Sequence, residues 1–373
     1  MTPPKVTVLV HGGPSSIEMV RVRGLTRRHP GDRLRILHRS GGMAATWKAW
    51  SNDLRESPPD LAYVLNTAAP GSIAAPLWSV TRGLAYVLDT GDAVHAMARS
   101  SGIGGGWKLP LLWLFERLAQ RRAAAVVVRG SRHRQLLLSQ GRSRVEVIRD
   151  GYSEQQQVSG ESVEALRREL GLQGRFVAGL MGSTVLSPRL GICYGWDLLE
   201  AMVLLKDQPV TGLLIGDGTG LPWLKQRARE LGVEDRVLFT GRIPYADVPR
   251  YLRLMDVALS TQTDNLAGRV RTTGKLPEYM AAGRYILASR VGDAEVLLPE
   301  PMLVDYEGEV DRAYPARLAG RIREVMASES LRRLALELPE RAERLCSYEH
   351  LSAQWSRLVA EVSGKAGPDD HPA

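Results

Sequence analysis

Short runs of aliphatic and β-branched residues alternate with amphipathic segments along most of the chain. In the first part of the sequence these runs predict β-strands at 6–10, 34–37, 61–65, 85–88, 125–128 and 145–148. Helical patterns lie between several of them, for example at 18–28 and 111–122. Apolar strands separated by helices are typical of a parallel sheet that is covered on both faces. Residues 1–165 are therefore predicted to form a doubly wound, Rossmann-like domain.

The same alternation starts again after a polar stretch at 153–170. The second set of strands is predicted at 176–181, 210–215, 237–240, 257–260 and 285–289. The helices of this half are predicted at 221–231, 248–254, 275–282, 316–327 and 331–344. Residues 166–347 are thus predicted to form a second Rossmann-like domain. The fold class is α/β, and a ligand is expected in the cleft between the domains, outside the carboxyl ends of the strands.

The end of the chain is expected to return to the first domain. The last helical pattern, at 348–363, has Trp355 and Leu358 on one apolar face, and we predict that it packs back on residues 1–165. The remaining residues, 364–373, have no apolar periodicity and are predicted to be disordered.

Composition and charge narrow the choice of partners. The two cysteines form neither a disulfide framework nor a clustered metal site, so a cytoplasmic location is expected. Residues 1–10 do not resemble a signal peptide, and no run is long enough to span a bilayer. The net charge of +8 suits an anionic partner. The basic residues are scattered, however, so nucleic acid is not expected as a partner.

The most informative stretch is 272–283, with the sequence TTGKLPEYMAAG. Lys275 and Glu278 are three residues apart, so at the start of a helix they face the same way. The lysine ammonium suits a phosphate group, and the carboxylate can accept hydrogen bonds from ribose hydroxyls. A capped surface helix with an unrelated Lys and Glu is the alternative interpretation of the same spacing.

This stretch resembles the nucleotide-binding helix of the retaining GT-B glycosyltransferases of family 4. The similarity continues upstream through LLIGDGTGLPWLKQRARELGVEDRVLFTGRIPYADVPRYLRLMDVALS and downstream through VGDAEVLL. The first half matches more weakly, at HGGPSS, AYVLDTGD and VEVIRDGYS. The resemblance implies the GT-B fold and transfer of a sugar from a nucleotide-diphosphate sugar to a hydroxyl acceptor, with retention of anomeric configuration.

By this resemblance, Glu278 holds the donor ribose and Lys275 helps to hold the diphosphate. Leu276, next in the helix, is included in the predicted donor site. Val270 departs from the family, which often places a second Glu there, near the donor sugar. The adjacent Arg271 is included as a source of positive charge. This departure leaves the identity of the sugar open.

Two further candidates lie in loops of the second domain. The family's basic pair after strand 176–181 is absent, and Arg189 is the candidate to reach the phosphates instead, with an ordinary loop arginine as the alternative. Gly216 belongs to a glycine-rich turn between a strand and a helix, where the backbone can approach a ligand. A simple tight turn is the competing interpretation.

In the first domain, glycines and carboxylates follow two of the strands. Gly12 and Gly13 follow strand 6–10 and would leave room for the donor phosphate. Asp92 and, after it, Asp89 are the candidate catalytic residues, because the family places polar residues at this edge, facing the donor sugar. A helix cap is the alternative role for an aspartate at a strand end.

The chain has neither an Asp-x-Asp motif nor a His/Cys ligand cluster, so no metal is expected, and the nucleotide sugar is the only co-substrate predicted. The apolar stretch 107–122, which ends in basic residues, leaves open a lipid-linked acceptor and a peripheral contact with the inner membrane face. A helix that faces the core is the alternative. Two other functions also stay open: a nucleotide-sugar 2-epimerase, and a non-catalytic nucleotide-binding or partner subunit on the same scaffold.

Overall fold

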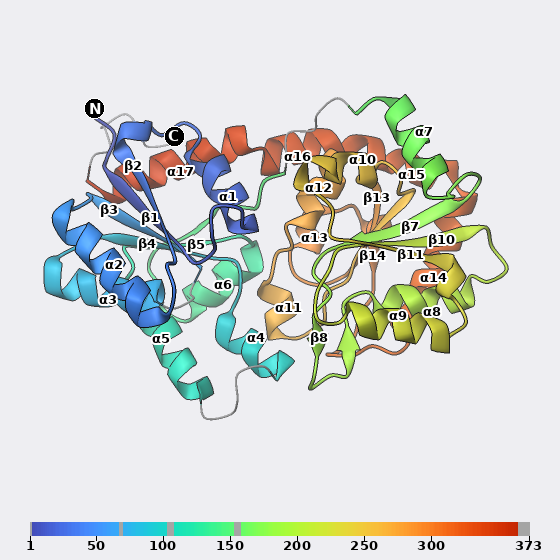
Figure 1. The fold of residues 1–373 in the computed structure, drawn as a ribbon, viewed down its shortest axis with the longest axis horizontal. Coiled ribbons are helices and arrows are strands. Elements are labelled where there is room, and N and C mark those ends of the chain that lie inside the picture. The colour runs from blue at the N-terminus through green and yellow to red at the C-terminus, as the bar shows by residue number, and fades with distance from the viewer. Residues whose placement is uncertain (1, 67–69, 103–107, 153–157, 365–373) are drawn as a thin grey trace.

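The computed structural model describes residues 2–66, 70–102, 108–152 and 158–364, and it contains two parallel six-stranded sheets side by side (Figure 1). The predicted α/β architecture with two Rossmann-like sheets is confirmed. Apart from Gly364, the tail predicted to be disordered lies outside the described residues.

The first sheet has the strand order β2-β1-β3-β4-β5-β6. Its strands are β1 (Val6–Val10), β2 (Leu34–His38), β3 (Leu61–Leu65), β4 (Tyr86–Thr90), β5 (Ala125–Val128) and β6 (Val145–Val147). Its helices are α1 (Ile17–Thr26), α2 (Met43–Glu56), α3 (Gly71–Arg82), α4 (Val94–Ser101), α5 (Leu109–Arg122) and α6 (Ser131–Ser139). β1, β3, β4 and β5 are buried at every position, which explains why their sequences are mostly apolar.

The second sheet has the strand order β11-β10-β7-β12-β13-β14. Its strands are β7 (Phe176–Met181), β10 (Val210–Ile215), β11 (Val237–Gly241), β12 (Val257–Ser260), β13 (Tyr285–Ser289) and β14 (Leu303–Val304), with a small hairpin of β8 (Leu186–Ser187) and β9 (Ile192–Cys193). Its helices are α7 (Gly160–Glu169), α8 (Trp196–Leu204), α9 (Leu221–Glu230), α10 (Val248–Leu252), α11 (Leu266–Val270), α12 (Lys275–Ala281), α13 (Ala294–Leu297) and α14 (Tyr314–Ala327).

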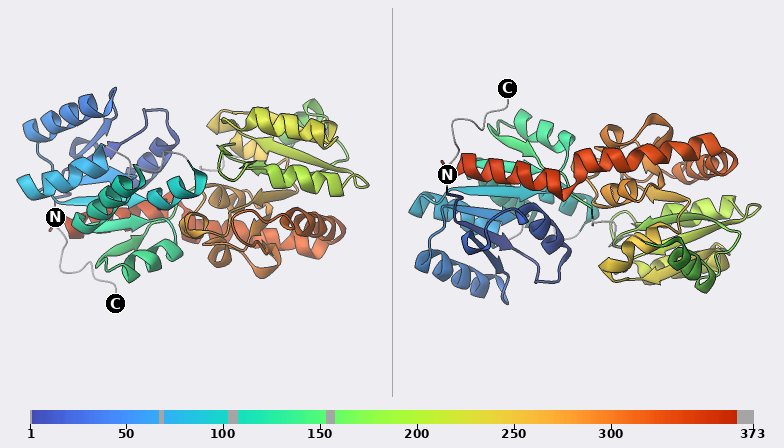
Figure 2. Two further views of the ribbon diagram at one scale, coloured as in Figure 1. Left: turned by 90° about the horizontal axis from the view of Figure 1, so that it is seen from below. Right: turned by 90° about the horizontal axis from the view of Figure 1, so that it is seen from above.

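The last helices run along both parts of the molecule, as Figure 2 shows for the red end of the chain. α15 (Glu329–Arg333) and α16 (Leu338–Cys346) lie on the second part, and α17 (Tyr348–Val362) packs against α1 of the first. Trp355 of α17 is fully buried and lies edge-on to Tyr63 of β3, with 5.7 Å between the ring centroids. The division of the chain at residues 165 and 347 stays a prediction.

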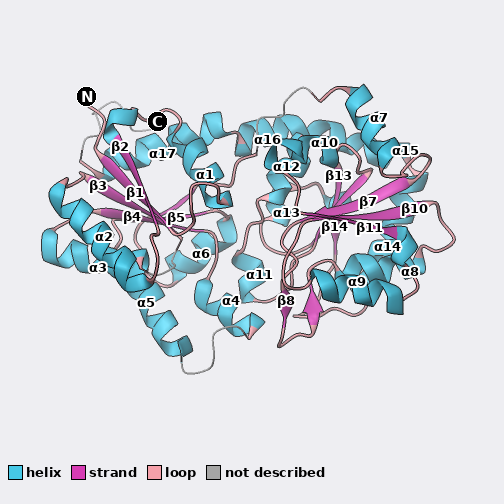
Figure 3. Ribbon diagram, viewed as in Figure 1, coloured by secondary structure: helices cyan, strands magenta, loops and turns pink. Residues whose placement is uncertain are grey.

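The helix predicted at 331–344 is not continuous in the structure. The pattern at 331–344 is broken into α15, a 3₁₀ turn at Leu334–Glu337 and α16 (Figure 3). Pro339 lies in the first turn of α16. A proline has no N–H to donate and clashes with the preceding turn, so it is tolerated at a helix start but not in a helix interior.

Candidate functional site

The carboxyl ends of the two sheets face each other, and side chains from both parts meet there. Asp92, which follows β4, forms an ion pair with Arg271, which precedes α12, with 3.2 Å between Oδ1 and Nε. Asp293, at the start of α13, accepts hydrogen bonds from the backbone N–H and the hydroxyl of Ser131 in α6, each at 3.0 Å. It also pairs with Arg149. These contacts hold the two halves together around the predicted ligand cleft.

Lys275 begins α12 and lies at the carboxyl edge of the second sheet. Its Nζ is 3.7 Å from the centroid of the Tyr194 ring, an arrangement in which the ring face attracts the cation. Burial of the ammonium group and the nearby Arg271 lower the pKa of Lys275 to about 7, whereas the carboxylate of Asp197 acts in the opposite direction. Near neutral pH both the neutral and the ammonium form of Lys275 are therefore populated. An anion bound beside it would favour the ammonium form.

Several buried polar atoms of the second part have no hydrogen-bond partner in the part of the chain that the structure describes. They are Asp197 Oδ1 and the hydroxyl oxygens of Thr184, Thr272 and Thr273. Buried polar groups are normally paired, and an unpaired one is costly. Three of these groups are hydroxyls in the segments that follow β7 and precede α12, and hydroxyls can donate to the oxygens of a phosphate group.

Glu278 lies one turn along α12 and is 4% exposed. Its Oε1 accepts a hydrogen bond from the Tyr245 hydroxyl at 2.7 Å. The predicted three-residue spacing thus places Glu278 and Lys275 on the same short helix. The carboxylate thus accepts a hydrogen bond from a hydroxyl group, as it could from a ribose hydroxyl.

Two predicted donor residues have mainly structural surroundings. The side chain of Leu276 is 4% exposed and belongs to the hydrophobic core of the second part, and its place in the donor site stays a prediction. Gly216 has φ +139°, and a Cβ there would lie 2.0 Å from the carbonyl oxygen of Gly182. Gly216 is thus required by the close approach of the loops that follow β7 and β10.

Arg189 lies away from Lys275, in the loop between β8 and β9. Its Nε donates to the backbone carbonyl of Ser100 at 2.6 Å, and its guanidinium forms an ion pair with Glu309. Because these contacts join the hairpin to α4 of the first part, the prediction that Arg189 reaches the phosphates is not supported by its position.

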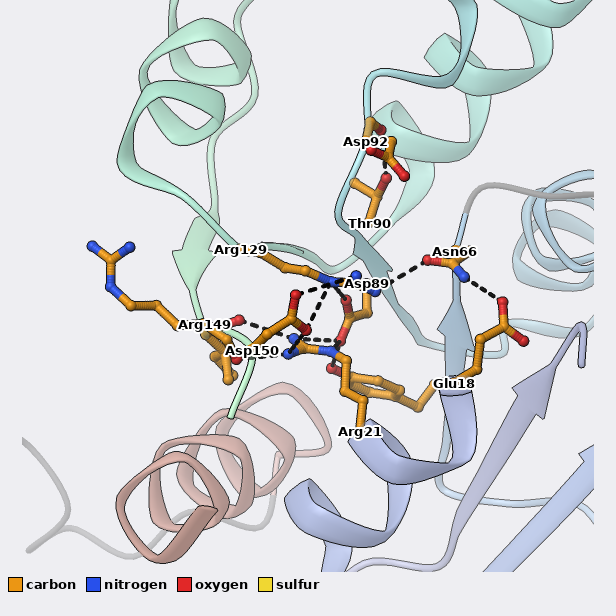
Figure 4. A network of polar contacts seen from close by, with 11 residues as sticks. Glu18, Arg21, Asn66, Asp89, Thr90, Asp92, Arg129, Arg149 and Asp150 are labelled. Carbon is orange, nitrogen blue, oxygen red and sulfur yellow. Dashed lines mark hydrogen bonds and ion pairs between the residues drawn. The ribbon is translucent and has the colours of Figure 1, made fainter. Parts of the chain in front are cut away.

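Asp89 requires a correction. It is fully buried, and its Oδ2 accepts from the Arg21 Nε at 2.9 Å and from the Tyr63 hydroxyl at 2.6 Å. Arg21 also pairs with Asp150 at 3.2 Å (Figure 4). A carboxylate enclosed in this way holds the carboxyl ends of the strands together and does not face a substrate. Asp92, in contrast, is partly exposed at the cleft.

The first-domain glycine loop is held by an acidic side chain that sequence reasoning missed. Glu18 of α1 accepts from the Gly12 backbone N–H at 2.6 Å and from the Asn66 side-chain amide (Figure 4). Asn66 follows β3, has φ +62°, and accepts from Arg129 at 3.2 Å. Gly13 is exposed, and a Cβ there would meet nothing within 4 Å. Gly13 therefore keeps the open space that the sequence predicts for this loop.

The described ranges contain neither a candidate metal-binding cluster nor a helix that could span a membrane. No group of three or more His, Cys, Asp or Glu side chains in them could hold a metal ion. No helix in the same ranges is long and apolar enough to cross a bilayer.

The part of the chain that contains Lys275 and Glu278 is similar to a known protein family. The family model of Glycosyl transferases group 1 matches residues 191–327. The chain has the GT-B fold, and residues 191–327 are similar to the glycosyl transferases group 1 family. The predicted resemblance to this family is thereby confirmed for these residues, whereas the subdivision into family 4 stays a prediction.

Two curated relatives match parts of the GT-B chain. The 2-deoxystreptamine glucosyltransferase of Streptomyces kanamyceticus is 27% identical over 248 residues, which cover 64% of this chain and 61% of that protein. The alpha-monoglucosyldiacylglycerol synthase of Streptococcus pneumoniae is 28% identical over 166 residues, 43% of this chain and 35% of that protein. The chain thus matches less than two thirds of the length of either relative.

Solved structures match the GT-B fold over almost the whole chain. Anabaena HepE in complex with UDP-glucose has a TM-score of 0.76 at 18% identity, and the match covers 96% of this chain and 100% of that one. Sucrose-phosphate synthase from Thermosynechococcus elongatus has a TM-score of 0.74 at 15% identity, with coverage of 97% and 100%. At these identities the likeness establishes the fold.

Proposed function

We propose that the chain is a glycosyltransferase that moves a sugar from a nucleotide-diphosphate sugar to a hydroxyl acceptor. One observation carries the proposal: the segment that matches the glycosyl transferases group 1 family also contains Lys275, the unpaired hydroxyls of Thr272 and Thr273, and Glu278. The family match and the local chemistry thus independently select the same part of the molecule.

In this proposal Lys275 and the two threonine hydroxyls hold the diphosphate, and Glu278 holds the ribose. When the bond to the anomeric carbon breaks, negative charge develops on the departing diphosphate. Groups already positioned to stabilise that charge lower the barrier, because they need no reorganisation at the moment of reaction. Arg271 supplies a further positive charge at the cleft, once it is released from Asp92 or shared with it.

The names of the relatives suggest which donor to test first. Both curated relatives are named for glucosyl compounds, and HepE was solved with UDP-glucose. These names support UDP-glucose as the first donor. The acceptor is proposed to be a hydroxyl compound, either soluble or lipid-linked. We further propose a cytoplasmic location with a peripheral contact at the inner membrane face, and retention of anomeric configuration.

The test is product analysis with UDP-glucose and a panel of hydroxyl acceptors. We expect release of UDP that depends on the acceptor, together with a new glycoside whose anomeric configuration can be read by NMR. A changed sugar without any acceptor would favour the 2-epimerase instead. Nucleotide binding without turnover on any acceptor would favour the non-catalytic subunit.

The protonation of Lys275 predicts the pH dependence of donor binding. In the free protein its pKa is lowered from 10.5 to about 7, so above that pH the amine is mostly neutral. A bound diphosphate favours the ammonium form and raises this pKa. At a pH between the pKa values of the free and the bound protein, binding must therefore take up a proton. The affinity for the donor is expected to increase as the pH falls towards 7 and to level off below it.

Calorimetry in two buffers of different ionisation enthalpy measures this uptake. UDP-glucose is the suitable ligand, because its diphosphate does not titrate near neutral pH. The expected result is an uptake that approaches one proton midway between the pKa values of Lys275 in the free and the bound protein and disappears in Lys275→Met. An uptake that persists in Lys275→Met would assign the proton to another group.

A further inference from the structure

Two neighbouring helices of the first part expose large apolar side chains. α3 and α5 pack against each other on the outside of the first sheet (Figure 1). The exposed apolar residues on them are Leu77, Val80, Leu111, Trp113, Leu114 and Leu118. Single exposed apolar side chains are common on any protein, but a group on adjacent helices marks an interaction surface.

The charged residues on these helices are almost all basic. Across α3, α4 and α5 the acidic residue is Glu116, which is 8% exposed. Its carboxylate accepts from the backbone N–H groups of Val94 and His95 at 2.8 and 2.9 Å, so it is used to hold the start of α4. The basic residues on or next to these helices are Arg82, Arg99, Lys108, Arg117, Arg121 and Arg122.

We propose that this surface, the basic apolar face formed by α3 and α5, docks on a lipid bilayer that contains anionic headgroups. An interfacial helix places its apolar side chains among the acyl chains and its basic residues at the headgroups. Trp113 fits this arrangement: the Arg117 guanidinium lies 5.5 Å from its ring centroid, so an apolar body and a cation occur together.

Charge distinguishes a bilayer from a second copy of the chain. A two-fold dimer through this face would bring the same arginines of both copies together, and the face has no exposed acidic side chain to oppose them. An anionic bilayer supplies the missing negative charge. Each arginine near such a surface is expected to strengthen binding about fivefold.

The position of α4 connects this face to the cleft. α4 packs against α5 on one side and against α11 of the second part on the other (Figure 1). Asp92, at the cleft, lies two residues before α4. A bilayer on the basic apolar face would therefore lie beside the cleft, where an acceptor held in the membrane can reach the donor. This last step, though not the docking itself, rests on the proposed glycosyl transfer.

Vesicle flotation tests the docking. The full chain is mixed with vesicles of phosphatidylcholine alone or with added phosphatidylglycerol. Strong binding is expected only with phosphatidylglycerol, and it should weaken as salt is added. Leu114→Glu/Leu118→Glu should abolish binding, and Arg121→Ala/Arg122→Ala should weaken it about 25-fold. Leu336→Glu and Arg168→Ala/Arg175→Ala, exposed residues elsewhere, should bind as the parent protein does.

Two results would overturn the docking proposal. One is equal binding of the parent protein and Leu114→Glu/Leu118→Glu to phosphatidylglycerol vesicles, or no binding by either. The other is a dimer in solution that Leu114→Glu/Leu118→Glu dissociates, because the face would then cover a second copy. UDP binding measured on the same proteins separates the docking proposal from the proposed donor site. If the parent protein does not bind UDP, the donor site is contradicted. If the parent and Leu114→Glu/Leu118→Glu both bind UDP, the vesicle result alone decides the docking.

Discussion

Glu278→Ala is expected to weaken UDP binding by on the order of 100-fold, because it removes the carboxylate that in the proposed site accepts two charge-assisted hydrogen bonds from the ribose. Glu278→Gln keeps the shape and one acceptor oxygen, so its loss should be intermediate. The variants should remain folded, since the Tyr245 hydroxyl that now donates to Glu278 is partly exposed and can turn to water. Isothermal calorimetry with UDP gives the affinities.

Glu340→Ala is the matched control, because Glu340 is an exposed glutamate of α16 in the same half of the protein. It should bind UDP as tightly as the parent chain. An unchanged affinity in Glu278→Ala, with a melting temperature close to that of the parent, would remove Glu278 from the ribose site.

Asp89→Ala is expected to lower the free energy of unfolding by about 3–5 kcal/mol, because it leaves the Arg21 guanidinium buried without its main counterion. Asp92→Ala should cost less than about 1 kcal/mol, since Asp92 and Arg271 form a partly exposed pair. Urea denaturation monitored by circular dichroism compares the two variants.

A second substitution at Asp89 distinguishes a structural role of this residue from a catalytic one. If Asp89 acts through the fold, Asp89→Asn, which retains a hydrogen-bond acceptor, should recover part of the stability and of the activity together. An Asp89→Ala protein as stable as the parent but without activity would instead mean that Asp89 contacts the substrate.

Local sequence patterns were sufficient for most of the fold and for placing the two proposed donor residues on one helix. β1, β3 and β5 begin and end at the predicted residues because each is a completely buried and mainly apolar run. Lys275 and Glu278 were predictable together because both lie on one short helix. At 331–344 the apolar pattern alone was misleading, since the backbone effect of Pro339 decides where the helix restarts.

The first-domain network was not predictable in the same way. Arg21 meets Asp89 across 68 positions and Asp150 across 129 positions of sequence. Such partners are brought together only by the order of the strands in the sheet, and no spacing in the sequence records it. Asp92 and, after it, Asp89 were therefore both candidates at the end of the same strand, although Asp89 is fully buried and Asp92 is partly exposed.

The central claim is that a nucleotide-diphosphate sugar binds at Lys275 and Glu278. The most direct test is a thermal-shift comparison of the parent chain with Lys275→Ala/Glu278→Ala, using UDP, GDP, ADP and dTDP and their sugars, since a ligand of the folded state raises the melting temperature. We predict that at least one nucleotide and its sugar stabilise the parent and that none stabilises the double variant. Equal stabilisation of both proteins, or no stabilisation of the parent by any of these ligands, would contradict the claim.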